Sequence, residues 1–192
     1  VNKENALKYG IVAAKDADKM VDYIDIKIDR GISKNRILML DILANFDWKR
    51  AIYFSGGSYA DEEYIWLKEY LQLDGMSYKL VPIKTSMKGK SMFDMGRIDS
   101  EKMYANIQKF DWKNINSGKI YLDEQTKKNA ISLRNNLMRL SETFAMEGVK
   151  LHSLSLKQPK RVHRIKELAH HTRRVYKQFA LPRNGGMGPN GT

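Results

Sequence analysis

The chain has 192 residues, of which 42% are hydrophobic and 29% are charged, so it can build one domain with a hydrophobic core and is not disordered as a whole. It contains no cysteine, which excludes disulfides, thiolate metal sites and a cysteine nucleophile, and no apolar run approaches the roughly 20 residues that span a bilayer. The net charge of +12 is concentrated at one end, since residues 1–148 hold 24 Lys/Arg against 21 Asp/Glu and residues 149–192 hold 10 against 1.

The first half of the chain predicts strands that alternate with helices. Apolar and polar residues alternate along residues 21–28, which predicts a first strand, and Ser33 is expected to cap a helix that closes near Trp48. Residues 51–54 form a second β-prone run, residues 60–71 an amphipathic helix that Gly75 ends, and residues 78–83 a third strand. Because short loops link these elements, we predict an α/β fold with a small parallel β-α-β-α-β sheet.

The second half of the chain predicts a loop followed by helices. Residues 84–96 are rich in Lys, Ser, Met and Gly, as is typical of a loop. Asp99 or Ser100 is expected to cap one helix, and Asp123 a longer one that ends at Gly148. The expected organisation is an α/β subdomain of residues 1–96, a helical segment of residues 97–148 that packs on it or starts a helical repeat, and a basic tail of residues 149–192 that is disordered or translated out of frame.

Four stretches carry a family resemblance. They are AKDADKMVDYIDIKI (14–28), MLDILANFDWKRAIYFSGG (39–57), YIWLKEYLQLDGMSYKLVPI (64–83) and GRIDSEKMYANIQKFDWKNINSGKIYLDEQTKKNAISLRNN (96–136). In this order they resemble the soluble C-terminal region of a family of large multi-spanning bacterial membrane proteins, a domain of unknown function that is grouped with protein O-mannosyltransferase-like glycosyltransferases. The chain departs from the family at Ala51, where the family tends to have proline, and after Gly148, where the resemblance stops.

The resemblance implies that the whole protein is a lipid-linked-sugar-dependent glycosyltransferase of the bacterial inner membrane. In that family the catalytic acid lies in an early loop between transmembrane helices, so no catalytic residue is expected in this chain, and we expect no cofactor. The resemblance implies a periplasmic module whose partners are the transmembrane portion of the same polypeptide and, for the full-length protein, an acceptor protein or a lipid-linked sugar. The chain begins at Val1 rather than Met, and we expect it to be a fragment.

The turn after the second predicted strand is a candidate ligand site. Its residues are Ser55, Gly56, Gly57, Ser58 and Tyr59. They would follow the carboxyl end of a parallel strand and lead into a helix N-terminus, where a sugar or phosphate could bind. No G-x-G-x-x-G or Walker pattern is present, however, and the acidic residues 61–63 would repel a phosphate, so a plain structural turn is the alternative.

An acidic series near the N-terminus is a second candidate, for acid/base chemistry or a divalent metal. It consists of Asp16, Asp18, Asp22, Asp25 and Asp29. The strand period places Asp25 and Asp29 on one solvent-facing side, and no calcium-loop glycine follows, so we favour a solvated face and assign no metal. The tryptophans Trp48, Trp66 and Trp112 could stack on sugar rings, but we interpret them as core or helix-end packing.

The tail contains a basic patch at helical spacing. Its members are Arg161, Arg164, Arg173, Arg174 and Lys177. Such a helix could bind the phosphates of nucleic acid or of an anionic membrane surface, whereas an out-of-frame tail would make the pattern accidental. The tail histidines do not form a tight zinc constellation, because neighbouring helical positions project in different directions.

The sequence therefore favours a non-catalytic, soluble accessory module of a membrane-embedded protein O-mannosyltransferase-like glycosyltransferase. The alternative is a free-standing basic protein that binds nucleic acid or an anionic membrane surface, with nucleic acid the less expected partner because the basicity lies in the tail. A free-standing α/β enzyme is disfavoured, since residues 1–148 contain no histidine, no cysteine and no recognisable catalytic pattern.

Overall fold

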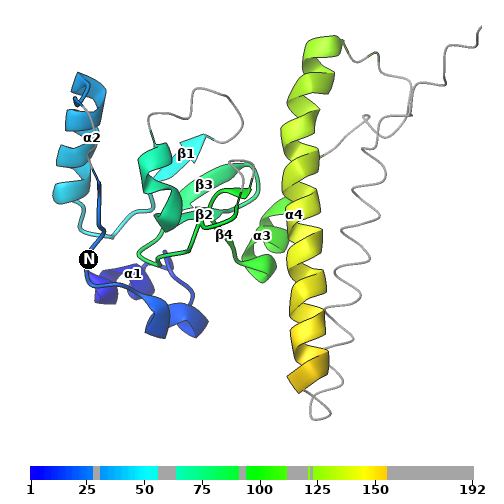
Figure 1. Cartoon of the computed structure of the whole chain (residues 1–192), viewed down its shortest axis with the longest axis horizontal. Helices are drawn as coiled ribbons and strands as arrows, with labels where there is room; N and C mark the ends of the chain where they lie inside the picture. Colours follow the sequence, from blue (N-terminus) through cyan, green and yellow to red (C-terminus); the bar gives the residue numbers. More distant parts are fainter. Residues whose placement is uncertain (28–30, 56–63, 91–93, 112–120, 122, 155–192) are drawn as a thin grey trace, which may run out of the picture. The chain divides into compact units, whose positions relative to one another are not determined.

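The computed structural model of the chain describes residues 1–27, 31–55, 64–90, 94–111, 121 and 123–154 (Figure 1). The chain divides into two compact units, an N-terminal unit of Val1–Asp111 and a C-terminal unit of Trp112–Thr192. Each unit is described by itself below. The boundaries expected after residues 96 and 148 stay predictions.

The N-terminal unit begins with two short helices that the sequence patterns did not reveal. Helix α1 spans Lys3–Lys8 and is capped by Asn2, whose side chain accepts a hydrogen bond from the Asn5 N–H at 2.9 Å. A 3₁₀-helix, η1, follows at Ala14–Lys19. Both are six residues long, so neither shows enough turns for a helical period to be recognised.

The first predicted strand is wrong over its described part, residues 21–27, which form no strand. Ile24 and Ile26 are less exposed than their neighbours, so the alternation of burial is real. The segment is held by isolated bonds instead of a ladder: the Val21 N–H donates to the Pro82 carbonyl at 2.9 Å, and the Asp25 N–H donates to the Tyr70 hydroxyl at 3.1 Å. An alternating segment without a partner strand therefore stays irregular.

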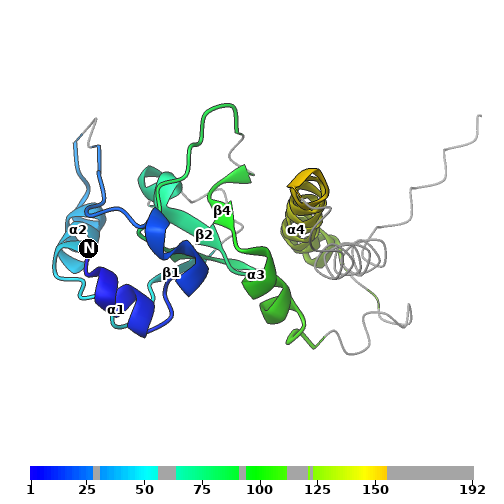
Figure 2. The same cartoon turned by 90° about the horizontal axis from the view of Figure 1, so that it is seen from below.

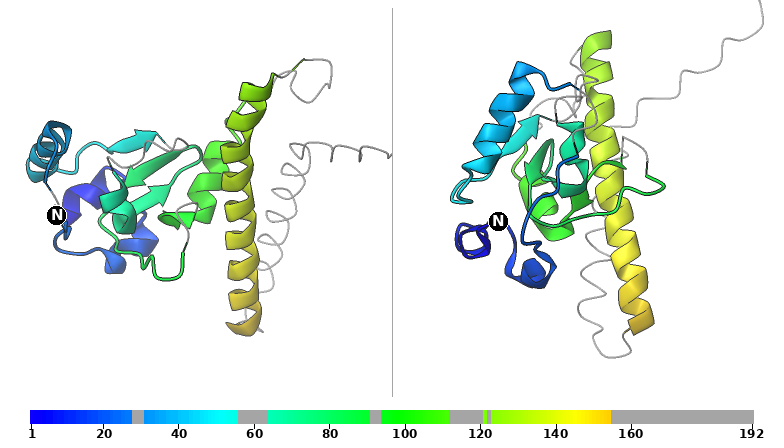
Figure 3. Two further views of the ribbon diagram at one scale, coloured as in Figure 1. Left: turned by 45° about the horizontal axis from the view of Figure 1, so that its top comes forward. Right: turned by 60° about the vertical axis from the view of Figure 1, so that its left-hand side comes forward.

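Helix α2 spans Lys34–Ala44, and its predicted cap is confirmed. Ser33 Oγ accepts a hydrogen bond from the Arg36 N–H at 3.3 Å. Although the helix is rich in Ile and Leu, none of its residues is buried. Figure 3 shows α2 beside β1, at one edge of the sheet.

The sheet has four short strands, β1 (Tyr53–Ser55), β2 (Leu71–Leu73), β3 (Ser77–Leu80) and β4 (Arg97–Ile98), in the order β1-β3-β2-β4. β3 pairs antiparallel with both β1 and β2, and only β2 and β4 are parallel. The mixed α/β class is thus present, but the predicted parallel sheet is not. Gly75 at φ +91° lets β2 turn directly back into β3 as a hairpin, so it ends no helix and no crossover separates these strands.

Two elements of the N-terminal unit have other boundaries than the sequence predicted. Within the predicted helix 60–71 the described residues form a 3₁₀-helix, η3, at Ile65–Tyr70, and Leu71 already belongs to β2. The predicted strand 78–83 overlaps β3, which ends at Leu80, two residues before Pro82. Leu71, Gln72 and Leu73 alternate between apolar and polar, as in a strand, and these three residues pair with β3.

The core of the N-terminal unit lies on one face of the sheet. The register places Phe54, Tyr78 and Leu73 on this face, together with Leu71 and Leu80. The Tyr64 ring stacks on Phe54 with centroids 5.0 Å apart, and Leu67 of η3 is fully buried. The apolar face is therefore covered by the segment that contains η3.

β4 leads directly into helix α3, which spans Ser100–Ile107 (Figure 2). The predicted cap is confirmed, since Asp99 Oδ1 accepts a hydrogen bond from the Lys102 N–H at 3.3 Å. Met103 and Ile107 are buried, so α3 packs its apolar face into the unit. Gly96 approaches β2 so closely that a Cβ there would lie 2.7 Å from the Leu71 carbonyl oxygen.

The C-terminal unit contains helix α4, Glu124–Leu154. Its predicted cap is confirmed, because Asp123 Oδ1 accepts a hydrogen bond from the Thr126 N–H at 2.6 Å. The predicted end at Gly148 is wrong, since the helix continues to Leu154; one internal glycine costs only about 1 kcal/mol relative to alanine, which a 31-residue helix tolerates. None of the helices in the described ranges combines the length and apolar character that crossing a membrane requires.

Candidate functional site

The turn predicted to bind a ligand lies mostly outside the described residues. Ser55 ends β1, and its carbonyl accepts a hydrogen bond from the Tyr64 hydroxyl at 2.9 Å. Gly56, Gly57, Ser58 and Tyr59 lie outside the described ranges, as do Arg161, Arg164, Arg173, Arg174 and Lys177 of the tail. Both site predictions therefore stay predictions.

The acidic series does not come together in space as a site. Asp16 is buried and forms ion pairs with Lys19 and Arg97, while Asp22 pairs with Lys3 at 2.6 Å. Asp29 lies outside the described residues. Across the part of the chain that the structure describes, no group of three or more His, Cys, Asp or Glu side chains could hold a metal ion.

The tryptophans differ in their surroundings. Trp48 is buried, lies 4.6 Å from the Phe46 ring between centroids, and has a backbone φ of +62°. Trp66 is half-buried in η3, and Trp112 lies outside the described residues. The packing interpretation fits Trp48, whose ring is covered and so offers no open face to a sugar.

The second face of the sheet carries a row of polar side chains, of which Gln72, Asp74 and Lys79 are buried and Tyr53 is exposed. Tyr53, Lys79, Gln72 and Arg97 are cross-strand neighbours from β1 to β4, and Asp74 follows Gln72 on the same face. Lys102 of α3 reaches this row, since its Nζ lies 3.9 Å from Asp74 Oδ2, and it also donates to the Gly10 carbonyl at 3.2 Å. This polar row is the most unusual electrostatic feature of the N-terminal unit.

Asp74 is the centre of the row. Its Oδ2 atom lies 3.3 Å from Lys79 Nζ, 3.9 Å from Lys102 Nζ and 3.5 Å from the Tyr53 hydroxyl, and its Oδ1 accepts a hydrogen bond from Gln72 Nε2 at 2.9 Å. Lys79 is 1% exposed, and its Nζ has no hydrogen-bond partner. One buried carboxylate thus faces two ammonium groups, which leaves an excess of positive charge.

The environment of Lys79 changes its protonation. The pKa of Lys79 is lowered from 10.5 to about 8, because burial and the nearby Lys102 ammonium together outweigh the opposite effect of Asp74. With this pKa, a substantial fraction of Lys79 is in the neutral amine form at mildly alkaline pH. However, the Lys79 side chain has almost no solvent access, so a role in covalent chemistry is not supported.

A second set of ion pairs connects η1 to β4 and α3. Asp16 Oδ2 lies 2.6 Å from Arg97 Nη2, and Lys15 Nζ lies 3.0 Å from Asp99 and 3.2 Å from Glu101. Burial alone would raise the pKa of Asp16, but hydrogen bonds from Lys19 and Arg97 outweigh it and hold that pKa below its usual value. These pairs fasten the N-terminal segment to the sheet and offer no open site.

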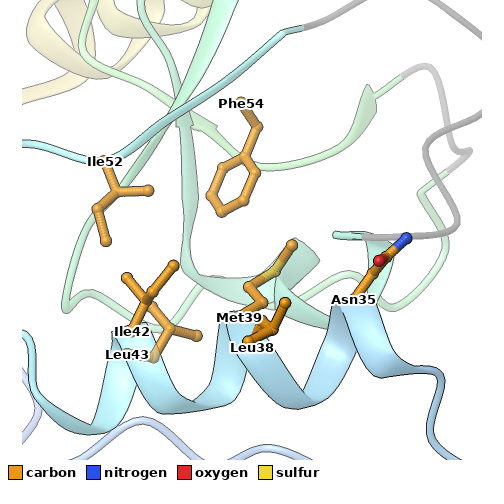
Figure 4. A pocket seen from close by; sticks show the side chains of 7 residues that line it. All are labelled: Asn35, Leu38, Met39, Ile42, Leu43, Ile52 and Phe54. Carbon is orange, nitrogen blue, oxygen red and sulfur yellow. The ribbon is translucent and has the colours of Figure 1, made fainter.

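An apolar groove lies open between α2 and β1 (Figure 4). It has a volume of about 330 Å³. Ile52 and Phe54 point from the strand toward α2, whose side chains line the other wall. The residues that line it are Asn35, Leu38, Met39, Ile42, Leu43, Ile52 and Phe54.

The groove is unusual because its apolar wall faces solvent. Leu38 is 64% exposed and Ile42 59% exposed, and Ile37 beside them is 54% exposed. A contiguous apolar surface of this kind, on a helix with no buried residue, is typical of an interaction site. The sequence predicted the helix but not its exposure, since apolar residues at helical spacing ordinarily mark a buried face.

The charges at the ends of the groove are mainly positive. Lys34 precedes the lining residue Asn35, and Arg50 precedes Ile52 by two positions. Neither forms an ion pair among the described residues, whereas the nearby Lys49 is paired with Asp47 at 2.9 Å. Arg36 adds a positive charge and Asp41 a negative one on α2, so a positive surplus remains.

Comparison with known proteins supplies the family. Residues 1–102, which include α1, α2 and the whole sheet, match the family model described as TMEM260-associated domain 2. That family is related to TMEM260, which is a protein O-mannosyltransferase-like protein. The comparisons with curated proteins and with solved structures each found no match.

Proposed function

The chain belongs to the TMEM260-associated domain 2 family, and on this premise we propose that it is a non-catalytic accessory module of a membrane-embedded protein O-mannosyltransferase-like glycosyltransferase. Its task is to bind a partner through the groove between α2 and β1. The proposed partner is the transmembrane portion of the same glycosyltransferase, with the module on the periplasmic side of a bacterial inner membrane. A lipid-linked sugar and an acceptor protein are ligands of the full-length protein in this proposal.

The observation that carries the proposal is the uncovered apolar surface of α2. A helix of 11 residues is marginal in water by itself, and most helices gain their stability by burying an apolar face. Fully burying a Leu or Ile side chain contributes about 1.5–3 kcal/mol, and α2 leaves Leu38 and Ile42 largely in solvent. A partner that covers these side chains would therefore stabilise both the helix and the complex.

The non-catalytic part of the proposal is supported by how the charged residues are used. The buried acids Asp16, Asp74 and Asp99 each face one or more cations at ion-pair distance. They fasten η1, the sheet and α3 to one another, and none lines the groove. The groove itself offers hydrophobic contact and one amide, from Asn35, and these bind rather than react.

The experiment that tests the proposal is co-purification from detergent. The tagged chain is co-expressed with the separate transmembrane portion of its own glycosyltransferase, and the ratio of the two polypeptides is measured. The double substitution Leu38→Asp with Ile42→Asp is expected to reduce co-purification about tenfold or more, because it places charge on the docking face. The matched control is Ile131→Asp on the exposed side of α4, at 55% exposure. Equal co-purification of the double variant and the wild type would disprove the proposed docking role.

The second candidate function, binding of nucleic acid or of an anionic membrane surface, is favoured by the 10 basic residues against one acidic residue in residues 149–192. A truncation tests it, and the structure places the cut after Leu154, where α4 ends in the described residues, instead of at Gly148. Salt-dependent binding of nucleic acid or of anionic vesicles by the full chain that is lost when residues 155–192 are removed would favour the second candidate over the accessory module.

A further inference from the structure

β1 is an edge strand among the described residues, with β3 on one side only. The Leu80 N–H donates to the Ile52 carbonyl at 3.0 Å, and in an antiparallel ladder hydrogen-bonded pairs alternate with non-hydrogen-bonded pairs. Tyr53 and Ser55 therefore direct their backbone groups away from β3. The Ser55 carbonyl is satisfied by the Tyr64 hydroxyl, which leaves the Tyr53 N–H and C=O and the Ser55 N–H at the open edge.

The open edge and the groove belong to the same strand. Phe54 faces the groove, and its two neighbours present their backbone groups at the edge. A helix beside an exposed sheet edge is the arrangement in which a protein takes up an extended peptide as an added strand. Main-chain hydrogen bonds then hold the peptide, and every second side chain enters the groove.

We propose that the groove binds an extended apolar peptide segment, flanked by acidic residues, as an additional strand on the free edge of β1. This rests on the proposed docking function and names the form of the partner. A helical partner would fill the groove but leave the Tyr53 backbone groups unsatisfied, because helix backbone groups bond to one another. An extended segment satisfies the backbone groups and fills the groove together.

The acidic flanks follow from the charges at the two ends of the groove. Lys34 lies in the first turn of α2, where the positive end of the helix dipole adds to its charge, and Arg50 precedes the strand at the other end. Asp41 is the acid on α2, and its carboxylate already accepts a hydrogen bond from Asn45 at 3.3 Å. A basic peptide would meet like charge at both ends of the groove.

Binding of defined peptides to the full 192-residue chain tests the proposal. The probe is a fluorescein-labelled peptide EEVIVTVEE, and its matched partners are KKVIVTVKK and an EEVIVTVEE peptide that is N-methylated at alternate residues. Fluorescence anisotropy is expected to show affinity for the acidic probe about tenfold or more above either partner. Binding of all three peptides with equal affinity, or of none, overturns the proposal.

A pair of substitutions isolates the backbone edge. Tyr53→Ala and Tyr53→Pro both remove the side chain, but only proline removes the N–H, which does not pair with β3 and faces the open edge. Tyr53→Pro is expected to weaken probe binding about fivefold or more relative to Tyr53→Ala. Thermal melting of both variants confirms that each is folded, and slowed amide exchange at Ser55 on binding provides a second readout that needs no substitution.

The outcome also separates this inference from the docking function. If Leu38→Asp with Ile42→Asp abolishes co-purification while Tyr53→Pro and Tyr53→Ala behave alike, the groove docks a partner but not as a strand, and the inference is wrong. Dimerisation of the chain that the same double substitution disrupts would show that a second copy fills the groove. Sedimentation with anionic vesicles that the double substitution disrupts would show a membrane surface there instead. Either result overturns the peptide proposal.

Discussion

Helices α2 and α3 of the N-terminal unit begin with the same kind of cap and differ in what covers them. Each is capped by a side-chain oxygen of the preceding residue, Ser33 for α2 and Asp99 for α3. α3 buries Met103 and Ile107, whereas α2 is longer and richer in Leu and Ile yet buries nothing. Local capping chemistry therefore sets where a helix begins, but the presence of a partner surface determines whether its apolar residues stabilise the fold.

The largest expected difference between the two helices concerns core packing. Met103→Ala removes a fully buried side chain and is expected to lower the free energy of unfolding by about 2–5 kcal/mol. Urea denaturation followed by circular dichroism measures this loss. A loss below about 1 kcal/mol would show that α3 is not part of the core, and the contrast with α2 would disappear.

The polar row that α3 covers should make stability depend on pH. The folded chain releases the Lys79 proton at about pH 8, and the unfolded chain keeps it to about 10.5. The unfolded chain therefore binds more protons between these values, and stability should rise with pH by at most about 1.4 kcal/mol per unit. Urea midpoints between pH 7.5 and 9.5 measure this rise, and Lys79→Met is expected to flatten it. An equal slope in the wild type and the variant would contradict the assignment.

The two caps should differ in strength because their surroundings differ. Asp99 is buried and also pairs with Lys15 at 3.0 Å, whereas Ser33 is exposed and its hydroxyl accepts the cap bond. We expect Asp99→Ala to cost about 1–2 kcal/mol and Ser33→Ala about 0.5–1 kcal/mol. Thermal melting of both variants under the same conditions gives the order. If Ser33→Ala cost more, α2 would be coupled to the core more strongly than its exposure indicates.

The smallest expected effect is on α2 itself. Leu38→Ala should change the free energy of unfolding by less than about 0.5 kcal/mol, because the side chain is largely exposed. The same variant should weaken partner binding, and co-purification measures this separately. A stability loss comparable to that of Met103→Ala would mean that α2 is already covered, and the docking proposal would lose its basis.

The parts of the fold that the sequence predicted depend on chemistry within a few residues. Ser33, Asp99 and Asp123 were expected as caps, and each accepts a hydrogen bond from the backbone N–H three residues ahead. The parallel pairing of the strands was predicted incorrectly, since the sheet is mixed, because pairing joins residues far apart in the chain. A usable signal was nevertheless present, since Asp74-Gly75 lies between two alternating runs and is typical of a hairpin.

The candidate site could not be predicted because it depends on what is covered. Lys79 and Gln72 occupy the polar side of an alternating pattern, which ordinarily faces water, but α3 and the N-terminal segment bury them. Leu38 and Ile42 belong to a helix whose apolar residues are spread around its whole circumference, as is typical of a buried helix, but they are exposed. Only the tertiary structure shows which of these surfaces are covered.

Gly96 has a consequence for recognising other members of the family. Its φ of +76° and the 2.7 Å separation between a Cβ placed there and the Leu71 carbonyl oxygen exclude every other residue type while β4 remains parallel to β2. A related sequence that keeps this sheet must therefore keep glycine at the equivalent place, directly before the β4 arginine. Glycine at this position is therefore expected to distinguish relatives that keep this strand arrangement from relatives that have lost it.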